Sequence, residues 1–296
     1  MRDAEQPAQA LGLDGARPDG MPRRGAAAAL RYPRVLLKLS GEALAGQTKF
    51  GYDFERLGFF AEQIVEVVRA GAEVGLVIGG GNIVRGAQLS RMGMERVGAD
   101  YMGMLGTVIN ALALQDVLEK RGLDTRVMTA IRMEELAEPY IRRRALAHLD
   151  AGRVVIFAAG TGNPYFSTDT AAALRAIQIK ADVIIKATSV DGVYSADPKQ
   201  DDTARRYESI SYRDVMLQDL RVMDQTAVTL SRENALPLIV LDAHRPGSVL
   251  RALRGEREGT LVSDAEATTP AAPAAAVSPP SAHPLSPTHT PDDGHH

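Results

Sequence analysis

The chain of 296 residues contains no cysteine and no tryptophan. Without thiols, disulfide bonds, thiolate nucleophiles and cysteine-ligated metals are excluded, and this composition fits a reducing cytoplasm, where we expect the protein to act. No apolar run reaches transmembrane length, and no apolar core follows the basic residues of the N-terminus as it would in a signal peptide. The net charge of −3 gives no electrostatic reason to expect nucleic acid as a partner. We therefore expect no membrane partner either.

Two common phosphate-binding motifs, the Walker A loop and the Rossmann G-x-G-x-x-G fingerprint, are also missing. A different glycine-rich stretch is present, because Gly79, Gly80 and Gly81 follow an apolar segment, residues 73–78, that is typical of a buried strand. Without β-carbons, such a turn lets phosphate oxygens approach backbone N–H groups. Arg85 follows on the same turn, where its guanidinium could bind a phosphate with two hydrogen bonds. A tight strand–helix turn with a solvated arginine is the structural alternative.

Strand-like and helix-like segments alternate along most of the chain. Apolar runs predict strands at residues 34–39, 73–78, 125–130, 154–159, 182–188 and 236–241, with a possible edge strand at 259–263. Helical spacing of apolar residues predicts helices after Asp53, at residues 102–120 and 133–149, from about residue 170, and at residues 246–254. This alternation predicts an α/β fold, a three-layer αβα sandwich around a central, mostly parallel sheet.

The two ends differ from the middle. Residues 1–30 and 265–296 are rich in alanine and proline and have no periodic apolar face, so we expect both to be disordered tails. Residues 31–264 would then form the folded domain.

Two lysines belong to predicted strands, Lys38 near the end of one and Lys186 inside another. Lys38 is followed by Ser40 and Gly41, which suits a strand–loop–helix phosphate site, although a lysine at the rim of a sheet is as plausible. Lys186 lies within the apolar run Val-Ile-Ile-Lys-Ala and requires an anionic partner if it is buried. Asp169 could be that partner, or it could cap the helix that begins near residue 170.

Residues 160–169 carry glycines, hydroxyls, an amide and two aromatic rings after a predicted strand, as a nucleobase and a phosphate would require. Asp100 could accept hydrogen bonds from a sugar diol. Its alternative role is to place a negative charge before the predicted helix 102–120, where the helix dipole would favour it.

Three of these strand ends share their motifs with one family. Together, Lys38-Leu-Ser-Gly41, Gly79-Gly-Gly-Asn-x-x-Arg-Gly86 and Val190-Asp-Gly-Val-Tyr-x-x-Asp-Pro198 resemble the amino-acid-kinase superfamily. Residues 160–166, Gly-Thr-Gly-Asn-Pro-Tyr-Phe, and residues 100–104 are similar to the bacterial uridylate kinases (UMP kinases) within it. The resemblance extends over residues 34–264. One position departs from the pattern, since many family members have lysine or asparagine where this chain has Ser189, which leaves the detail of the ATP pocket open.

The resemblance implies an N-terminal lobe for the acceptor and a C-terminal lobe for ATP. It also implies Mg²⁺-dependent transfer of the γ-phosphoryl group of ATP to UMP, in a homohexamer that GTP activates and UTP inhibits. Lys38 and Arg85 would be the main catalytic residues. Lys186 and Asp169 would be secondary catalytic residues, with Asp169 orienting the two lysines. The sequence offers no carboxylate cage for a metal, so we expect ATP phosphates and water to hold most of the Mg²⁺.

The same resemblance assigns the ligand contacts. ATP would meet Lys38, Leu39, Ser40, Gly41, Gly81, Arg85, Thr188, Tyr194 and Asp197. UMP would meet Gly80, Asp100, Thr161, Gly162, Asn163, Pro164, Tyr165, Phe166, Ser167 and Thr168. The allosteric GTP loop would be Gly46, Gln47, Thr48, Lys49, Phe50 and Gly51.

Two alternatives to a UMP kinase remain open. The chain could be another kinase of this type, acting on a carboxylate or a carbamate, although residues 160–166 argue against it. It could also be a regulatory protein that senses UMP or UTP without turnover. The presence of both Lys38 and Arg85 argues against this second alternative, since a sensor has no need to stabilise a transition state.

Overall fold

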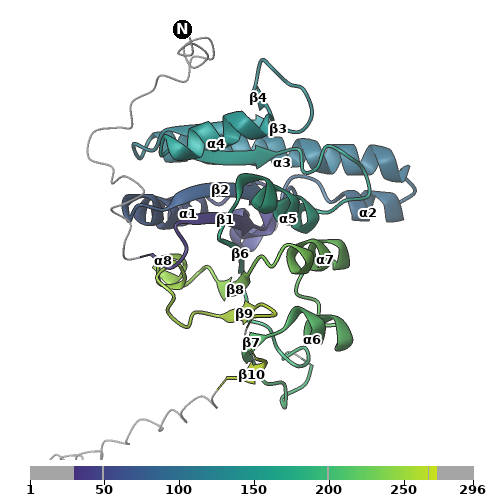
Figure 1. The fold of residues 1–296 in the computed structure, drawn as a ribbon. Helices are drawn as coiled ribbons and strands as arrows, with labels where there is room; N and C mark the ends of the chain where they lie inside the picture. Colours follow the sequence, from purple (N-terminus) through teal and green to yellow (C-terminus); the bar gives the residue numbers. More distant parts are fainter. Residues whose placement is uncertain (1–29, 49, 199, 266, 272–296) are drawn as a thin grey trace, which may run out of the picture.

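The computed structural model describes residues 30–271 except 49, 199 and 266 (Figure 1). The strands are β1 (Arg34–Leu39), β2 (Glu73–Ile78), β3 (Thr125–Thr129), β4 (Glu138–Pro139), β5 (Val154–Ala158), β6 (Val183–Thr188), β7 (Tyr207–Ile210), β8 (Leu238–Asp242), β9 (Thr260–Val262) and β10 (Thr269–Pro270). The helices are α1 (Phe54–Arg69), α2 (Gly86–Arg91), α3 (Arg96–Glu119), α4 (Arg142–Asp150), α5 (Thr168–Ile179), α6 (Tyr212–Leu217), α7 (Gln225–Glu233) and α8 (Ser248–Leu253).

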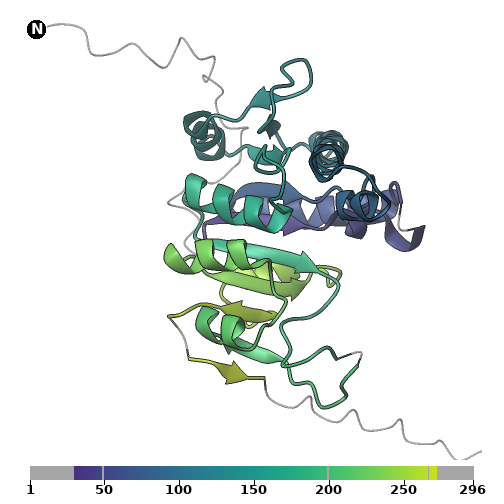
Figure 2. The ribbon, with the colours of Figure 1, turned by 90° about the vertical axis from the view of Figure 1, so that its right-hand side faces the viewer.

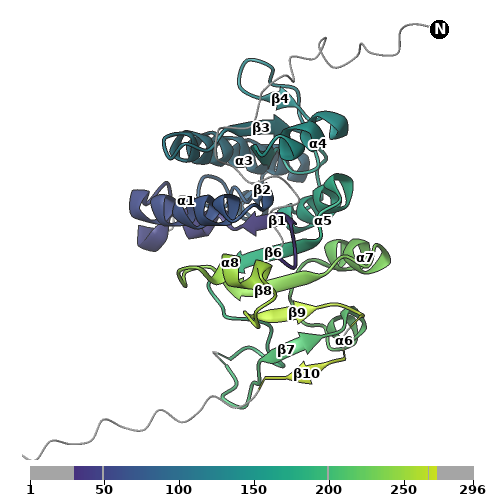
Figure 3. The same ribbon diagram turned by 60° about the vertical axis from the view of Figure 1, so that its left-hand side comes forward.

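One sheet runs through the described residues in the order β10-β7-β9-β8-β6-β1-β2-β5-β3-β4. Neighbouring strands are parallel except for the pairs β7–β10 and β8–β9, which confirms the mostly parallel α/β prediction. Helices α1, α3 and α8 lie on one face and α4 to α7 on the other, so the fold has three layers (Figure 3). Alternate residues of β1 enter the two apolar cores, Val35 and Leu37 on one side and Leu36 on the other. Burial on both faces explains why the central strands are almost continuously apolar.

Helix α3 begins earlier than predicted. It starts at Arg96 rather than near residue 102, because the Glu95 carboxylate accepts hydrogen bonds from the Val97 and Gly98 N–H groups (3.1 and 3.2 Å). Asp100 therefore lies within the helix, and the prediction that it precedes the helix is wrong. Helix α4 starts later than predicted, at Arg142 instead of residue 133, since β4 pairs with β3 in between.

The C-terminal part of the sheet extends further than the sequence indicated. Strand β9 lies between β8 and β7, so the prediction of an edge strand at 259–263 is wrong. Strand β10 pairs with β7, which means that the chain stays on the sheet beyond residue 264, where composition had placed the start of a tail (Figure 2). Residues 1–29 and 272–296, the greater part of both predicted tails, lie outside the described residues.

By length and composition alone, α3 is apolar enough to cross a membrane, and it is the one such helix in the described part of the chain. A core helix passes the same test, and α3 packs one side, including Met104, Val108 and Ala111, into the apolar core. Its other side leaves apolar residues exposed: Tyr101, Met102, Leu105 and Ile109. The two sides of this helix therefore have different surroundings.

A buried ion network anchors the start of β1. The Arg34 side chain is 3% exposed, and its Nε lies 2.6 Å from Oε2 of Glu73, which is 4% exposed. The same guanidinium donates to the Ile179 carbonyl (2.7 Å) and pairs with Asp150 (2.6 Å). Arg34 thus joins β1, β2 and the ends of α4 and α5 at the amino end of β1, whereas Lys38 lies near the carboxyl end of the same strand.

We expect Arg34→Leu to lower the free energy of unfolding by about 3–5 kcal/mol, because it breaks the buried ion pair with Glu73. The double variant Arg34→Leu/Glu73→Leu should recover much of this loss. Arg121→Leu, which removes a more exposed pair with Glu62, is the control and should cost about 1 kcal/mol or less. Urea unfolding measures all three, and a double variant no more stable than Arg34→Leu would contradict this account.

Candidate active site

Two lysines and one carboxylate form the centre of the site. Lys38 of β1 and Lys186 of β6 are register partners on adjacent parallel strands. Asp169 lies between them, with its two oxygens 2.7 Å from Lys38 Nζ and 3.0 Å from Lys186 Nζ. Lys186 Nζ also donates to the Val222 carbonyl (2.6 Å). The structure therefore provides the anionic partner that Lys186 was expected to need.

The start of α5 explains why Asp169 is available to the lysines. The Ser167 hydroxyl accepts hydrogen bonds from the N–H groups of Asp169 (2.9 Å) and Thr170 (3.2 Å), as an N-cap does. The alternative that Asp169 caps this helix is therefore wrong. Because Ser167 supplies the cap, the Asp169 carboxylate is directed to the two ammonium groups instead.

Burial and charge act in opposite directions on these groups. Burial raises the pKa of the Asp169 carboxyl, but the ammonium groups of Lys38 and Lys186 outweigh it and hold this pKa below its ordinary value. Burial lowers the pKa of Lys186, the Asp169 carboxylate partly opposes this, and Lys38 lowers it further. Asp169 thus remains ionised and balances one of the two lysines, so a fully protonated cluster keeps a positive charge that favours an anion.

A cavity of about 620 Å³ opens beside this cluster. Its lining includes four cationic side chains, Lys38, Arg56, Arg85 and Lys186, and one carboxylate, Glu42, together with Ser40, Ala43, Gly46, Ala187, Thr188, Ser189 and His244. An excess of cations with hydroxyl groups suits a polyphosphate.

The glycines beside this cavity allow backbones to approach one another closely. A β-carbon at Gly41 would lie 2.4 Å from the Gly79 carbonyl oxygen and 2.8 Å from Gly81 N, so the turns after β1 and β2 are in direct contact. A β-carbon at Gly80 would lie 2.6 Å from the carbonyl oxygen of Gly103 in α3. These contacts require glycine whether or not a phosphate is bound, and they bring the two predicted phosphate loops together.

Arg85 is one of the residues that line the cavity of about 620 Å³, which we call the phosphate cavity. Its side chain is 45% exposed, and its guanidinium pairs with Glu42 Oε1 (2.9 Å) and donates to the Gly81 carbonyl (3.3 Å). The sequence analysis did not identify Glu42 as a partner, because the two residues lie on different loops. The arginine predicted to bind phosphate is thus held by a carboxylate that solvent reaches.

A second cavity, of about 660 Å³, adjoins the phosphate cavity and shares Lys186 and Thr188 with it. Tyr194 and Asp197, both predicted to hold the adenosine end of ATP, line this cavity. The Tyr194 hydroxyl donates to Asp191 (2.7 Å). Leu39 differs from the other predicted ATP residues, since its side chain is buried in the core and only its main chain could meet a ligand.

A third cavity, of about 150 Å³, lies between the loop after β2, helix α3 and the loop after β5. The predicted acceptor residues in its lining are Gly80, Asp100, Thr161, Phe166, Ser167 and Thr168. The lining does not include Gly162, Asn163, Pro164 and Tyr165, which lie on the same loop. The structure thus gathers part of the predicted UMP set around one cavity.

Asp100 organises that loop. Its Oδ2 accepts hydrogen bonds from the Tyr165 N–H and the Arg96 guanidinium, both at 2.8 Å. Tyr165 has a φ of +72°, a left-handed conformation that is uncommon outside glycine, and the Arg96 guanidinium lies over its ring at 5.4 Å. Asp100 therefore holds the loop in position, in addition to any contact with a sugar.

The loop predicted to bind GTP borders the phosphate cavity through Gly46. Residues Gly46–Thr48 form a 3-10 helix, and the Thr48 hydroxyl donates to the Ala45 carbonyl (2.7 Å) and to the Phe50 carbonyl (2.9 Å). Phe50 is strongly exposed. Lys49 lies outside the described residues, and the side chain of Gln47 is likewise not described.

Asp224 is a supporting residue that the sequence analysis missed. Its carboxylate accepts hydrogen bonds from the hydroxyls of Ser167 and Thr170 and from the Ala227 N–H, so it caps α7 and ties it to the start of α5. The only signal in the sequence is an aspartate before a short helical segment, which is typical of any N-cap.

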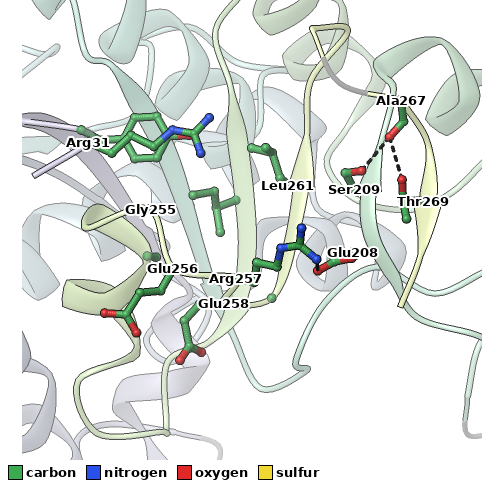
Figure 4. A pocket seen from close by; sticks show the side chains of 14 residues that line it. Arg31, Glu208, Ser209, Gly255, Glu256, Arg257, Glu258, Leu261, Ala267 and Thr269 are labelled. Carbon is green, nitrogen blue, oxygen red and sulfur yellow. Dashed lines mark hydrogen bonds and ion pairs between the residues drawn. The ribbon is translucent and has the colours of Figure 1, made fainter. Parts of the chain in front are cut away.

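A cavity of about 510 Å³ lies apart from these three, between residues 31–32, residues 255–259 and the strands β7 and β9 (Figure 4). Its charges include two ion pairs, Arg257 with Glu208 and Glu258 with Arg251. None of the site residues predicted from the sequence lines it. The candidate site is therefore the group of three cavities around the lysine pair.

The whole arrangement can be compared with known proteins. Residues 33–242 match the amino acid kinase family. The structure is similar to the UMP kinase from Bacillus anthracis, with a TM-score of 0.79 and 45% sequence identity over 81% of this chain and 99% of that one. It is also similar to the UMP kinase from Ureaplasma parvum (TM-score 0.75, 36% identity, 79% and 100% covered) and to the uridylate kinase from Archaeoglobus fulgidus (0.61, 30%, 77% and 99%). The chain therefore belongs to the amino acid kinase family.

Proposed function

We propose that the protein is an ATP-dependent UMP kinase, which transfers the γ-phosphoryl group of ATP to UMP and yields ADP and UDP. One observation carries this proposal: the lysine–aspartate cluster connects the lining of the phosphate cavity with that of the third cavity, which we call the acceptor cavity. Lys38 and Lys186 line the phosphate cavity, while Thr168, next to Asp169, lines the acceptor cavity. The identity of 30–45% with UMP kinases supports UMP over a carboxylate or carbamate as acceptor.

Phosphoryl transfer requires the protein chiefly to position the two substrates and to place positive charge around the transferring group. The phosphate of UMP is already ionised, so its oxygen can attack the γ-phosphorus without a general base, and negative charge then spreads over the oxygens of the transferring group. Lys38, Lys186 and Arg85 supply positive charge around that group, and the backbone N–H groups of Gly80 and Gly81 add dipoles. Asp169 holds the two lysines in place and contacts no substrate.

Mg²⁺ fits the donor side as a partner of ATP. Among the described residues, no cluster of three or more His, Cys, Asp or Glu side chains could hold a metal ion by itself. The oxygens that face the phosphate cavity, the Glu42 carboxylate and the hydroxyls of Ser40 and Thr188, suit a hydrated ion bound chiefly by phosphate oxygens. When bound, the ion would neutralise part of the charge on those oxygens.

We further propose that the protein acts in the cytoplasm as a homohexamer, with GTP as activator at residues 46–51 and UTP as inhibitor. The exposed apolar side of α3, formed by Tyr101, Met102, Leu105 and Ile109, supports self-association, because exposed apolar patches often mark interfaces. The position of Gly46 in the lining of the phosphate cavity supports an effect of this loop on catalysis.

The first test is the choice of acceptor. In a coupled assay of ADP release, we expect kcat/KM for UMP to exceed that for CMP and dTMP by roughly 100-fold or more, as a site built on hydrogen bonds to the correct base would give. N-acetylglutamate and carbamate should give no turnover. Equal use of UMP and CMP would refute the UMP assignment, and binding of UMP without ADP release would indicate a sensor.

The second test separates transition-state stabilisation from binding. Arg85→Lys keeps the charge but loses the planar pair of donors, so we expect kcat to fall on the order of 10²-fold with a smaller rise in the UMP KM. Asp100→Asn should act chiefly on KM, because a contact with the sugar is formed equally in the ground state and the transition state. Steady-state kinetics, with circular dichroism as a folding control, measure both. An effect of Arg85→Lys on KM alone would make Arg85 a binding residue.

The third test concerns the pH dependence set by Lys186. Because the pKa of its ammonium group is lowered in the free protein, it loses its proton at a lower pH than an ordinary lysine, and we expect kcat/KM to decline on the alkaline side below pH 10.5. Lys186→Arg should move this decline to higher pH, since a guanidinium stays protonated.

Unfolding does not account for such a decline. A lysine whose pKa is lower in the folded than in the unfolded protein adds stability as the pH rises between the two values. Thermal unfolding across the same pH range provides the control. An unchanged alkaline limb in Lys186→Arg would show that another group controls it.

A further inference from the structure

Two buried asparagines face each other beside the candidate phosphate site. Asn82 lies in the turn that follows the three glycines, Asn110 lies in α3, and both side chains are fully buried. The Asn110 Nδ2 donates to the Asn82 Oδ1 (2.7 Å), and the Asn82 Nδ2 donates to the Asn110 Oδ1 (3.1 Å). The two amides thus form a reciprocal pair.

The remaining hydrogen bonds of the pair reach two loops. The Asn110 Nδ2 donates to the Gly79 carbonyl (2.7 Å), and the Asn82 Nδ2 donates to the Gly51 carbonyl (2.9 Å). Since carbonyls only accept, these two bonds determine which way each amide is turned. The Tyr52 hydroxyl donates to the Asn110 Oδ1 (2.9 Å).

The backbone completes the link between the loops, since the Gly51 N–H donates to the Asn82 carbonyl (2.9 Å). Residues 51–52 and the glycine turn are therefore joined through one polar cluster.

The pair also lies against the turn that carries Ser40 and Gly41. A β-carbon at Gly41 would lie 2.5 Å from the Asn82 Oδ1, which is as close as its approach to the glycine turn itself. Both asparagines are fully buried and so cannot touch a nucleotide. Any effect on the reaction must pass through the backbone atoms that they hold.

We propose that Asn82 and Asn110 are positioning residues, which set the backbone of residues 79–81 for phosphoryl transfer and keep Gly51 and Tyr52 in a fixed relation to it. This role rests on the proposed kinase function. Its physical basis is that a lost amide would leave the buried Gly79 carbonyl or the partly buried Gly51 carbonyl without its side-chain donor. Backbone donors displaced by even about 1 Å are aimed poorly at a transition state.

The proposal predicts that the two amides act as one unit. Asn110→Leu and Asn82→Leu should each lower kcat by roughly 10-fold or more with a smaller change in the UMP KM, as loss of transition-state positioning does. The double variant should lose no more than the worse single variant, because the first substitution already breaks the pair. Leu118→Ala is the control, since it creates a cavity in the same helix without touching either loop, and its kcat should stay within about 2-fold of the unsubstituted protein.

A milder pair of variants keeps the test decisive if the leucine variants fold poorly. Tyr52→Phe removes only the hydroxyl that reaches Asn110, and Tyr212→Phe is its match, since that buried hydroxyl donates to the Leu236 carbonyl (2.7 Å) far from both loops. In hydrogen exchange without nucleotide, Tyr52→Phe should speed exchange in residues 51–52 and 79–84 together, whereas Tyr212→Phe should leave both segments unchanged.

Three results would overturn the proposal: kcat losses that multiply in the double variant, faster exchange in only one of the two segments, or an equal loss of kcat in Leu118→Ala at equal melting temperature. The exchange measurement needs no substrate. If the unsubstituted protein did not phosphorylate UMP, the proposed function would fail, while the link between the two loops would still be judged by exchange.

Discussion

The arrangement of the site depends on one constraint, which is that two lysines occupy neighbouring register positions on adjacent parallel strands. Like charges this close, in a largely buried place, repel each other, so the pair needs an anion between them. Asp169 meets that need only because Ser167 caps α5 and leaves the aspartate free, and Ser167 is itself bound by Asp224. Strand register, helix start and helix cap therefore act together to leave one positive charge for a phosphate.

Helix α3 shapes the acceptor cavity through close backbone contacts. Its backbone lies against Gly80 at a distance that no β-carbon would permit, and a β-carbon at Gly86 would lie 2.6 Å from the Ala99 carbonyl oxygen. Close contact of α3 with the turn after β2 places Asp100 where it can hold the loop after β5. Because Glu95 starts the helix early, Asp100 comes from a rigid turn of helix rather than from a flexible connection. The acceptor cavity is thus shaped by backbone contacts as much as by side chains.

Local patterns in the sequence were enough to find the strands and the residues at their ends. Lys38 and the glycine turn lie at the ends of apolar runs and Lys186 lies within one, and in a parallel sheet the carboxyl ends of the strands lie side by side, so the sequence indicated that these residues would be near one another. Helix caps were harder to predict. Serine, aspartate and glutamate can all accept hydrogen bonds from the first N–H groups of a helix, and when they lie at neighbouring positions, small differences in geometry decide which of them is the cap. The ion pair of Arg85 with Glu42 and the pairing of β10 with β7 join segments distant in sequence, and no local pattern indicates them.

The candidate site therefore combines a fixed cationic part and an adaptable one. Lys38 and Lys186 share a largely buried carboxylate, and breaking such a pair costs about 3–5 kcal/mol, so their positions are set before any ligand arrives. Arg85 pairs with Glu42 where solvent reaches both, and a pair of that kind is worth about 0–1 kcal/mol. A polyphosphate, with more charge and more acceptor oxygens than one carboxylate, can replace Glu42 at little cost. With the proposed function, the arginine would follow the transferring group, while the lysines and the backbone turns would define where transfer takes place.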